Sequence, residues 1–524
     1  MKITLIHPPA LMARSNYSTI TQPHLGLAYI AAFVRERGHE VEIVDGVGEA
    51  ISTFTVWEPR PDFLVQGLSF DDIIERVAPD TELIGLTCMF THSWPMVREL
   101  AKAVKAAFPD IPLVAGGEHV TAMHELVLTE SPVDACVLGE GEETFNELAN
   151  AYADGTDLGS VAGISYCPTE TGDVTVTAAR SRIRDVDALP WPAWDLIDPM
   201  AYLDSKVFIG PRAGRTMPML ATRGCPYQCT YCASPQMWGT NWFARDVDDV
   251  INEMAHQYEV HGANDFQFQD LTTVVNKRWI LSFCEKLIER GLDIRWQLPV
   301  GTRCEAIDAD VAEMLQRSGC SYIQYAAESG SERILDEVKK KVSLEHLEQT
   351  AVDSVKAGIT VCVLLMVGFP GETNEDVRKT FRLIRKLARD GIHEVAVSVL
   401  VPLPNTEMFR QLQAERKIEL DDDYCYWMSG ATTMTTARSW NPNISSRKLL
   451  FLKLLGLAEF YAISYALHPN RLARAIRNAW RGEQESKVDR VLREAIEKVA
   501  IISKLRRTAP AIPARQAAER RPAA

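Results

Sequence analysis

The most constraining feature of the chain is a regular alternation of apolar, strand-like runs with amphipathic, helix-like runs over roughly its first 400 residues. In the first part the strand-like runs are Lys2–Pro9, Val41–Asp45, Glu82–Phe90, Pro112–Gly117 and Ala135–Thr144, and the helical patterns are Leu25–Gly38 and Trp94–Phe108. Such an alternation with nearly all-apolar strands predicts a parallel sheet covered by helices on both faces.

A proline-rich connector, Asp187–Pro199, ends this first series. Six further strand-like runs follow it: Pro218–Thr222, Asp265–Gln269, Ile294–Val300, Tyr322–Ala327, Thr360–Gly368 and Glu394–Val401. Six β/α units predict a partial TIM-like barrel, (β/α)6, with its site at the carboxyl ends of the strands. We therefore expect an α/β chain with a Rossmann-like domain at 1–186, a linker at 187–212, the barrel at 213–420, a helical C-terminal domain at 421–507 and a disordered tail at 508–524.

Length and charge exclude several kinds of protein. At 524 residues the chain is too long for one hydrophobic core, and its 46% hydrophobic content is that of a globular protein. The formal net charge of −14 argues against a general nucleic-acid binder. Because the first residues have the pattern of a strand and not of a signal peptide, we expect a cytoplasmic protein.

The C-terminal region is basic, unlike the rest of the chain. No apolar run reaches the roughly 18 uncharged residues of a membrane span, since the longest, Leu449–Leu467, contains Lys453 and Glu459. The residues that follow it carry four arginines at helical spacing: Arg471, Arg474, Arg477 and Arg481. A helical cap on the barrel with a solvated basic face is the favoured interpretation. Peripheral contact with an anionic membrane is the alternative.

Three of the eleven cysteines are clustered, and they carry the functional argument. Cys225, Cys229 and Cys232 form a C-x3-C-x2-C motif just after the first barrel strand, in a loop that also contains Gly224 and Pro226. Three thiolates at this spacing can bind three irons of a [4Fe–4S] cubane and leave the fourth iron open to chelate S-adenosylmethionine (SAM). The alternatives are a zinc site, which normally uses other cysteine spacings, and coincidence. The remaining eight cysteines are scattered singly, as buried small hydrophobes are.

This motif, with Tyr231 as its aromatic residue, resembles the signature of the radical SAM superfamily. Three later segments, Phe266–Lys277, Ala326–Leu335 and Leu364–Thr373, resemble SAM-contacting segments of that superfamily. The resemblance implies that the cysteines bind the cluster and that SAM is contacted by Tyr231, Asp270, Glu328, Ser329, Gly368, Gly371 and Glu372. For Asp270 and Glu328 a salt-bridged carboxylate at the barrel rim is the plainer alternative.

The first domain resembles the cobalamin-binding modules fused to one branch of this superfamily, in its IHPP, VAGGEHVT and VLGEGEETF segments. The resemblance implies that cobalamin is contacted by Pro8, Thr87, Gly116, Gly117, Gly139, Glu140 and Gly141 at the carboxyl ends of the strands. No D-x-H-x-x-G motif is present, and His24 has the wrong neighbours for a cobalt ligand. Cobalamin is therefore expected base-off, without a histidine on cobalt. A vestigial or nucleotide-binding domain is the alternative, although no G-x-G-x-x-G follows the first strand.

These resemblances imply a cobalamin-dependent radical SAM methyltransferase with a small-molecule substrate and a flavodoxin- or ferredoxin-type electron donor. It would methylate an unactivated carbon, through methylcobalamin and a 5′-deoxyadenosyl radical, or a phosphinate phosphorus, which needs no hydrogen abstraction. The chain also resembles the anaerobic magnesium-protoporphyrin monomethyl ester cyclases, which implies radical oxidation without methyl transfer as the alternative. A non-catalytic cobalamin carrier or sensor is the alternative of another class.

Overall fold

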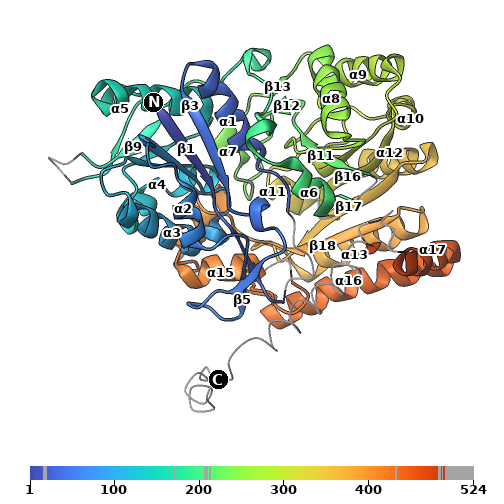
Figure 1. Ribbon diagram of the computed structural model, residues 1–524. Helices are drawn as coiled ribbons and strands as arrows, with labels where there is room; N and C mark the ends of the chain where they lie inside the picture. The colour runs from blue at the N-terminus through green and yellow to red at the C-terminus, as the bar shows by residue number, and fades with distance from the viewer. Residues whose placement is uncertain are drawn as a thin grey trace.

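The computed structural model describes residues 1–15, 21–168, 172–205, 210–211, 214–430, 433–481, 486 and 488–489. Two α/β lobes lie side by side, and helices of the C-terminal region extend along one edge (Figure 1). The predicted helices beyond Arg481, and the predicted tail at 508–524, lie almost entirely outside the described residues.

The front lobe is built on a seven-stranded sheet in the order β10-β9-β8-β7-β6-β1-β3. Its strands are β1 (Lys2–His7), β3 (Glu40–Asp45), β6 (Leu83–Thr87), β7 (Leu113–Gly116), β8 (Ala135–Val137), β9 (Ile164–Tyr166) and β10 (Thr175–Val176). The first five are parallel, as predicted, and β9 and β10 add an antiparallel edge. The strand order reverses direction between β1 and β6, which is where doubly wound sheets bind their ligands.

Helices cover both faces of this sheet. One apolar core lies under α1 (Leu25–Glu36) and α5 (Gly141–Asp154). A second core lies under α2 (Phe70–Arg76), α3 (Trp94–Ala107) and α4 (Glu118–Glu130). A small antiparallel sheet of β2 (Ala10–Ala13), β4 (Phe54–Val56) and β5 (Phe63–Gln66), which the sequence patterns did not predict, extends this second core.

The second lobe is a six-stranded parallel sheet in the order of the chain, β11-β14-β15-β16-β17-β18, as expected of a partial barrel. Its strands are β11 (Thr216–Met219), β14 (Asp265–Phe268), β15 (Arg295–Thr302), β16 (Cys320–Glu328), β17 (Thr360–Val367) and β18 (Glu394–Val399). Its helices are α8 (Val247–His261), α9 (Lys277–Arg290), α10 (Ala309–Arg317), α11 (Glu332–Glu337), α12 (Leu344–Ala357) and α13 (Asn374–Arg389). A two-stranded ribbon, β12 (Thr222–Arg223) and β13 (Phe243–Ala244), brackets the cysteine loop and the short helix α7 (Ser234–Trp238).

The connector and the front lobe pack directly on the barrel. Tyr29 and Ala28 of α1 share one continuous core with barrel strands and with Tyr202 of α6 (Pro199–Ser205). The hydroxyl of Tyr202 donates to Asp45 at the end of β3, at 2.7 Å to Oδ2. The lobes therefore meet along a buried interface, and their strand ends are held in fixed relation to each other.

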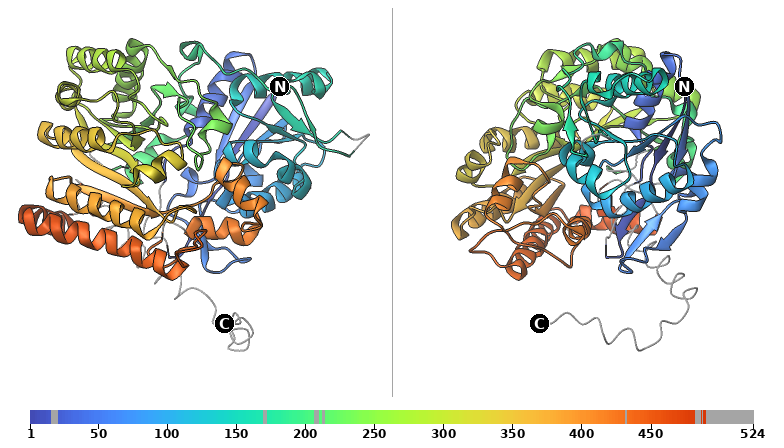
Figure 2. Two further views of the ribbon diagram at one scale, coloured as in Figure 1. Left: turned by 180° about the vertical axis from the view of Figure 1, so that it is seen from behind. Right: turned by 90° about the vertical axis from the view of Figure 1, so that its left-hand side faces the viewer.

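The C-terminal helices contact both lobes (Figure 2). After α14 (Glu407–Ala414), α15 (Asp422–Gly430) packs on the front lobe, where Trp57 Nε1 donates to the Tyr426 hydroxyl at 2.9 Å. In contrast, α16 (Ser446–Leu467) packs on α13 and β18 of the barrel, and α17 (Pro469–Arg481) continues from its end. By length and composition alone α16 could cross a membrane, contrary to the sequence expectation, but 33% of that stretch is buried inside the structure.

Candidate active site between the two lobes

The cysteine loop begins directly after β12. The backbone N–H of Cys232 donates to the Cys229 carbonyl at 3.1 Å. Gly224, directly before the loop, has φ +86°, and a Cβ there would lie 2.1 Å from the Asn241 carbonyl oxygen. A glycine is therefore required before Cys225, because any side chain would collide with the backbone opposite.

The three thiols are half-buried, and they lie close enough together that a charge on Cys229 raises the pKa of Cys225 and of Cys232. Burial, followed by these charges, raises the pKa of the Cys232 thiol to about 12, so iron binding must displace a proton there. A cubane needs three thiolates, one for each of three irons, and the loop supplies them at Cys225, Cys229 and Cys232.

A second turn, Val338–Lys341, closes over the cysteine loop. Arg303 donates to the carbonyl oxygens of Lys340 at 2.7 Å and Lys341 at 2.5 Å, and its guanidinium lies 3.8 Å from the centre of the Tyr227 ring. Thr230 N donates to the Val338 carbonyl at 3.1 Å. The turn thus shields one side of the loop from solvent and brings basic side chains beside the thiols.

Two of the predicted SAM residues, Tyr231 and Glu328, lie together beside this turn. The carboxylate of Glu328 forms a buried ion pair with Lys340, at 2.9 Å, and its negative charge helps burial to hold the pKa of the Tyr231 phenol far above its usual value. Glu328 has φ +66°, a left-handed conformation that a non-glycine residue adopts only under constraint. Sequence reasoning missed Lys340, whose long side chain returns to the site from beyond α11.

The predicted residue Asp270 is used to anchor the strand that leads into the cysteine loop. It is fully buried, and it accepts hydrogen bonds from the Thr222 hydroxyl at 2.5 Å and from Ala221 N at 3.2 Å. Burial raises the pKa of its carboxyl to about 6. A contact between Asp270 and SAM stays a prediction, because its oxygens already hold β12 against β14.

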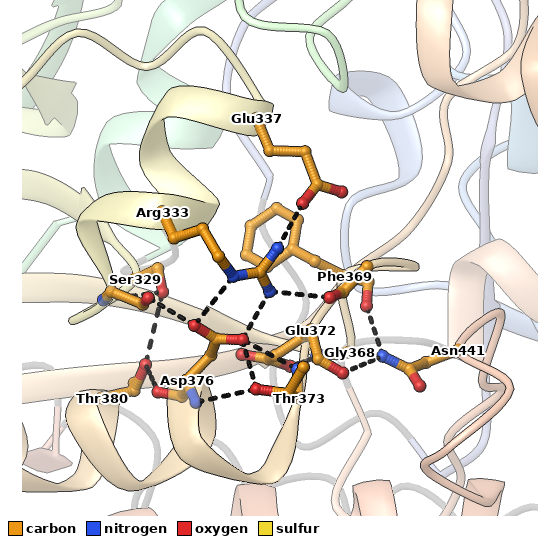
Figure 3. A network of polar contacts seen from close by, with 12 residues as sticks. Ser329, Arg333, Glu337, Gly368, Phe369, Glu372, Thr373, Asp376, Thr380 and Asn441 are labelled. Atoms are coloured by element: carbon orange, nitrogen blue, oxygen red, sulfur yellow. Dashed lines mark hydrogen bonds and ion pairs between the residues drawn. The ribbon is translucent and has the colours of Figure 1, made fainter.

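The last predicted segment, Leu364–Thr373, forms a tightly bonded loop after β17 (Figure 3). Glu372 Oε2 accepts from Gly368 N at 2.7 Å, and Asn441 Nδ2 donates to the carbonyl oxygens of Phe369 and Glu372, each at 2.7 Å. Burial raises the pKa of the Glu372 carboxyl to about 7. These hydrogen bonds join residues of the loop to one another and to Asn441, and so fix the conformation of the loop.

Two further predicted SAM residues lie beside this loop: Ser329 directly after β16 and Gly371 within the loop. The Ser329 hydroxyl is 3.3 Å from that of Thr380 on α13 (Figure 3). A Cβ on Gly371 would lie 2.2 Å from the Glu337 carboxylate on α11. Ser329 therefore packs against α13 and Gly371 against α11, and a direct role for either in binding SAM stays a prediction.

An open hollow with a cavity volume of about 280 Å³ lies between the lobes. This volume is close to the lower end of the roughly 300–1,000 Å³ of ordinary small-molecule pockets. Of the predicted cobalamin residues, all but Pro8 line it: Thr87, Gly116, Gly117, Gly139, Glu140 and Gly141. The barrel contributes the opposite wall, with Thr222, Arg223, Gly224, Gln269 and Leu271. The residues that lead into the cysteine loop, up to Gly224, and the glycine-lined strand ends therefore face one cavity.

Glycine is needed at the front-lobe wall for reasons that the structure makes explicit. Gly117 has φ +114°, and a Cβ there would lie 2.6 Å from the Cys88 carbonyl oxygen. Gly139 has φ +75°, and a Cβ there would lie 3.8 Å from the Met237 carbonyl oxygen. The wall consequently presents backbone to the cavity, which suits the close approach of a flat macrocycle.

His24 lines the cavity, but its ring is committed to the helix that it precedes. Its Nδ1 accepts the backbone N–H of Leu27 at 3.1 Å and so caps α1, which places the ring proton on Nε2. Nε2 lies 3.5 Å from the Thr87 hydroxyl, and burial lowers the pKa of the ring to about 3. A neutral ring held in this tautomer has no free lone pair for cobalt, which supports the expected absence of a histidine ligand.

An ion-pair network links the two walls, and sequence reasoning missed it. Arg223, directly before Gly224, pairs with Glu142 at 2.6 Å and with Glu140 at 3.4 Å, and Arg182 pairs with Glu140 at 2.6 Å. Arg223 and both glutamates are buried. The carboxylate of Glu140, a predicted cobalamin contact, is thus engaged by two guanidiniums, and the GEGE turn is attached to the strand of the cysteine loop. The only sequence signal was the arginine next to the motif.

Two polar groups of the cavity have no assigned role from the sequence. Burial raises the pKa of the Glu118 carboxyl, at the start of α4, to about 7. On the barrel side, Gln269 Nε2 is buried and has no hydrogen-bond partner among the described residues. A donor and a carboxyl are therefore available for a bound molecule with polar groups.

Comparison with known proteins assigns the two lobes separately. Residues 18–149 match the B12-binding domain family, and residues 219–384 match the radical SAM superfamily. An uncharacterized methyltransferase of Pyrococcus horikoshii is 32% identical over 78% of this chain and 82% of its own length. Cytidylyl-2-hydroxyethylphosphonate methyltransferase of Streptomyces wedmorensis is 26% identical, over 78% and 81%. The anaerobic magnesium-protoporphyrin IX monomethyl ester cyclase of Rubrivivax gelatinosus is 27% identical, over 79% and 70%.

Solved structures share the two-lobed fold. The cobalamin-dependent SAM radical enzyme OxsB, with aqua-cobalamin and SAM bound, matches with a TM-score of 0.66 and 14% identity, over 97% of this chain and 80% of its own. The radical SAM methyltransferase TsrM of Kitasatospora setae matches with a TM-score of 0.62 and 18% identity, over 79% and 78%. Together with the sequence matches, these findings show that the chain belongs to the cobalamin-dependent radical SAM enzymes, whose cofactors are cobalamin, SAM and a [4Fe–4S] cluster.

Proposed function

We propose that this enzyme transfers a methyl group to an unactivated carbon, or to a phosphinate phosphorus, of a small molecule. The observation that carries the proposal is one cavity with the strand and glycine that lead into the cysteine loop on one wall and the glycine-lined strand ends on the other. Bound there, cobalamin would carry the methyl group, and SAM cleaved at the cluster would supply the hydrogen-abstracting radical.

The residues of the chain have distinct parts in this proposal. Cys225, Cys229 and Cys232 hold the cluster, and the Tyr231–Glu328 pair, kept in place by Lys340, faces the side where SAM would bind. The glycines at 116, 117 and 139 admit the macrocycle edge, while Arg223 keeps the two walls in register. Burial of Glu328, Lys340 and Arg223 keeps water away from these ion pairs.

The cobalamin would be bound base-off without a histidine ligand, since the ring of His24 caps α1. A flavodoxin- or ferredoxin-type protein would deliver the electron. Two methyltransferases among the matched relatives favour methyl transfer.

A second candidate function is oxidative cyclisation of a porphyrin-like substrate without methyl transfer. It is favoured by the similarity to the magnesium-protoporphyrin IX monomethyl ester cyclase over 79% of this chain. In that case the same cavity would bind cobalamin, but SAM would not transfer its methyl group to cobalamin or to the substrate.

The test is an anaerobic reaction. The protein is reconstituted with iron, sulfide and hydroxocobalamin, then given reductant and SAM carrying a deuterated methyl group. Deuterated methylcobalamin together with S-adenosylhomocysteine would support methyl transfer. Turnover to 5′-deoxyadenosine alone, with cobalamin bound but unmethylated, would refute it and favour the cyclase.

A further inference from the structure

The outer layer of the barrel carries a charge opposite to that of the chain as a whole. Helices α13, α16 and α17 together contain thirteen Lys and Arg side chains against three Asp and Glu, a net charge of +10. The whole chain has a formal charge of −14. Because α16 packs on α13 and α17 continues from α16, these charges gather along one edge of the molecule (Figure 2).

An apolar stripe runs through this basic edge. Phe451 is 60% exposed and Leu454 is 40% exposed, and Ala458 and Ala462 continue the same face of α16 one and two turns further on. On α17, Leu472 and Ile476 are 43% and 54% exposed. Large apolar side chains exposed in a row at helical spacing are unusual on a surface that contacts only water.

The charged residues of α16 do not interrupt this stripe. Lys453 is buried and donates to the Thr433 carbonyl at 2.8 Å, and Glu459 is turned toward α13, where it pairs with Arg385 at 2.7 Å. The stripe is thus free of acidic groups, while Arg447 at its start and Arg477 and Arg481 on α17 are exposed.

We propose that α16 and α17 dock the enzyme on an anionic membrane surface. The exposed apolar side of α16 and the amphipathic α17 would lie in the plane of the interface, with their apolar side chains at the boundary between headgroups and acyl chains and the arginines of α17 among the anionic headgroups. Spanning is disfavoured, because α16 keeps its other face in the barrel wall. Pairing with a second copy is disfavoured by the repulsion between two basic surfaces.

The docked face adjoins the mouth of the barrel. Leu449, at the start of α16, packs against the loop after β17, where a Cβ on Gly368 would lie 2.9 Å from its side chain. Docking through Phe451 and Leu454 therefore brings the barrel mouth close to the membrane. This docking inference rests on the proposed function. It implies that the substrate is an amphiphilic molecule that partitions into a membrane surface.

The test is sedimentation of the full-length holoenzyme with phosphatidylcholine vesicles, with and without phosphatidylglycerol. We expect at least tenfold tighter binding to the anionic vesicles at low salt, and loss of that preference at high salt. F451D/L454D should weaken binding by roughly tenfold or more. R477E/R481E should weaken it by at least about 25-fold, given a factor of roughly five for each basic residue lost.

Matched controls separate docking from a general loss of structure. V260D introduces a charge at an exposed apolar position of α8, and R290E reverses an exposed charge on α9, both far from the stripe. Neither control should change vesicle binding, and circular dichroism should show all variants folded.

Equal binding to neutral and anionic vesicles, or no binding to either, would overturn the proposal. So would a dimer in light scattering that F451D/L454D dissociates, or salt-sensitive capture of a purified acidic flavodoxin that R477E/R481E abolishes while vesicles do not bind. Vesicle binding does not depend on turnover, so its failure is distinguishable from failure of the proposed methyl transfer.

Discussion

The two walls of the cavity are built in different ways. The front-lobe wall is made of backbone, with Gly116, Gly117 and Gly139 at the strand ends, and it leaves open space. The barrel wall is made of side chains that already hold one another, such as Asp270 with Thr222 and Glu328 with Lys340. A site of the first kind accommodates a large cofactor by shape. A site of the second kind positions a small reactive centre by rigid polar contacts.

The largest effect should come from the cluster loop, on the barrel wall. C229A removes the thiolate of one cluster iron, so it should abolish the brown cluster absorbance and lower SAM cleavage by at least ~100-fold. Absorbance spectra and 5′-deoxyadenosine formation measure both. C167A, at a half-buried cysteine remote from the loop, is the control. Continued SAM cleavage by C229A would mean that the cluster is not bound by this loop.

The second-largest effect is expected at the ion-pair network that joins the two walls of the cavity. R223M leaves Glu142 buried without its partner and leaves Glu140 with Arg182 alone, which should lower the free energy of unfolding by about 3–5 kcal/mol. R180M, which removes an arginine paired with the more exposed Glu147 and Glu143, should cost about 1 kcal/mol or less. Denaturant titration compares the two. Equal costs would mean that the walls are joined by apolar packing alone.

The loop after β17 should make stability depend on pH. The folded pKa of Glu372, about 7, lies above its ordinary value of 4.5, so the folded state holds the proton more tightly. Stability from this group is present below about pH 4.5 and is lost as the pH rises through 7, by up to ~3 kcal/mol. E372Q, a mimic of the protonated acid, should remove that dependence. Unchanged pH dependence together with weakened SAM binding would instead make Glu372 a SAM ligand.

The backbone wall can be probed at a single glycine. G117A puts a methyl group 2.6 Å from the Cys88 carbonyl oxygen and strains a backbone at φ +114°. Cobalamin affinity should fall about tenfold or more, with SAM binding retained. G155A, at φ +65° with open space around it, is the control and should leave cobalamin affinity unchanged. Unaltered cobalamin binding by G117A would place the cofactor elsewhere.

The smallest effect is expected at the helix cap. H24N keeps a side chain that can cap α1, so stability should change by less than about 0.5 kcal/mol and cobalamin affinity by less than about twofold. Visible titration with hydroxocobalamin measures the affinity. A tenfold loss would identify His24 as a cobalt ligand after all.

The same contrast explains what the sequence could predict. Parallel strands, the cysteine loop and the glycine wall follow from local patterns, because apolar runs, spacing and glycine each have a local physical cause. Six of the seven predicted cobalamin residues line one cavity. Lys340, Arg182 and Arg223 were missed because their partners, Glu328, Glu140 and Glu142, lie at other points of the chain. Asp270, Ser329 and Glu372 also form hydrogen bonds within the protein. Motifs do not show such bonds, so they do not show which of these side chains remain available to bind SAM.

The central claim is that cobalamin and the cluster share the cavity between the lobes. Electron paramagnetic resonance of the holoenzyme tests it directly, with cobalamin as cobalt(II) and the cluster first oxidised and then reduced. We predict a cobalt signal without splitting from an axial nitrogen, broadened and faster-relaxing once the cluster is reduced. An unchanged cobalt signal, or one split by an imidazole nitrogen, would contradict the account.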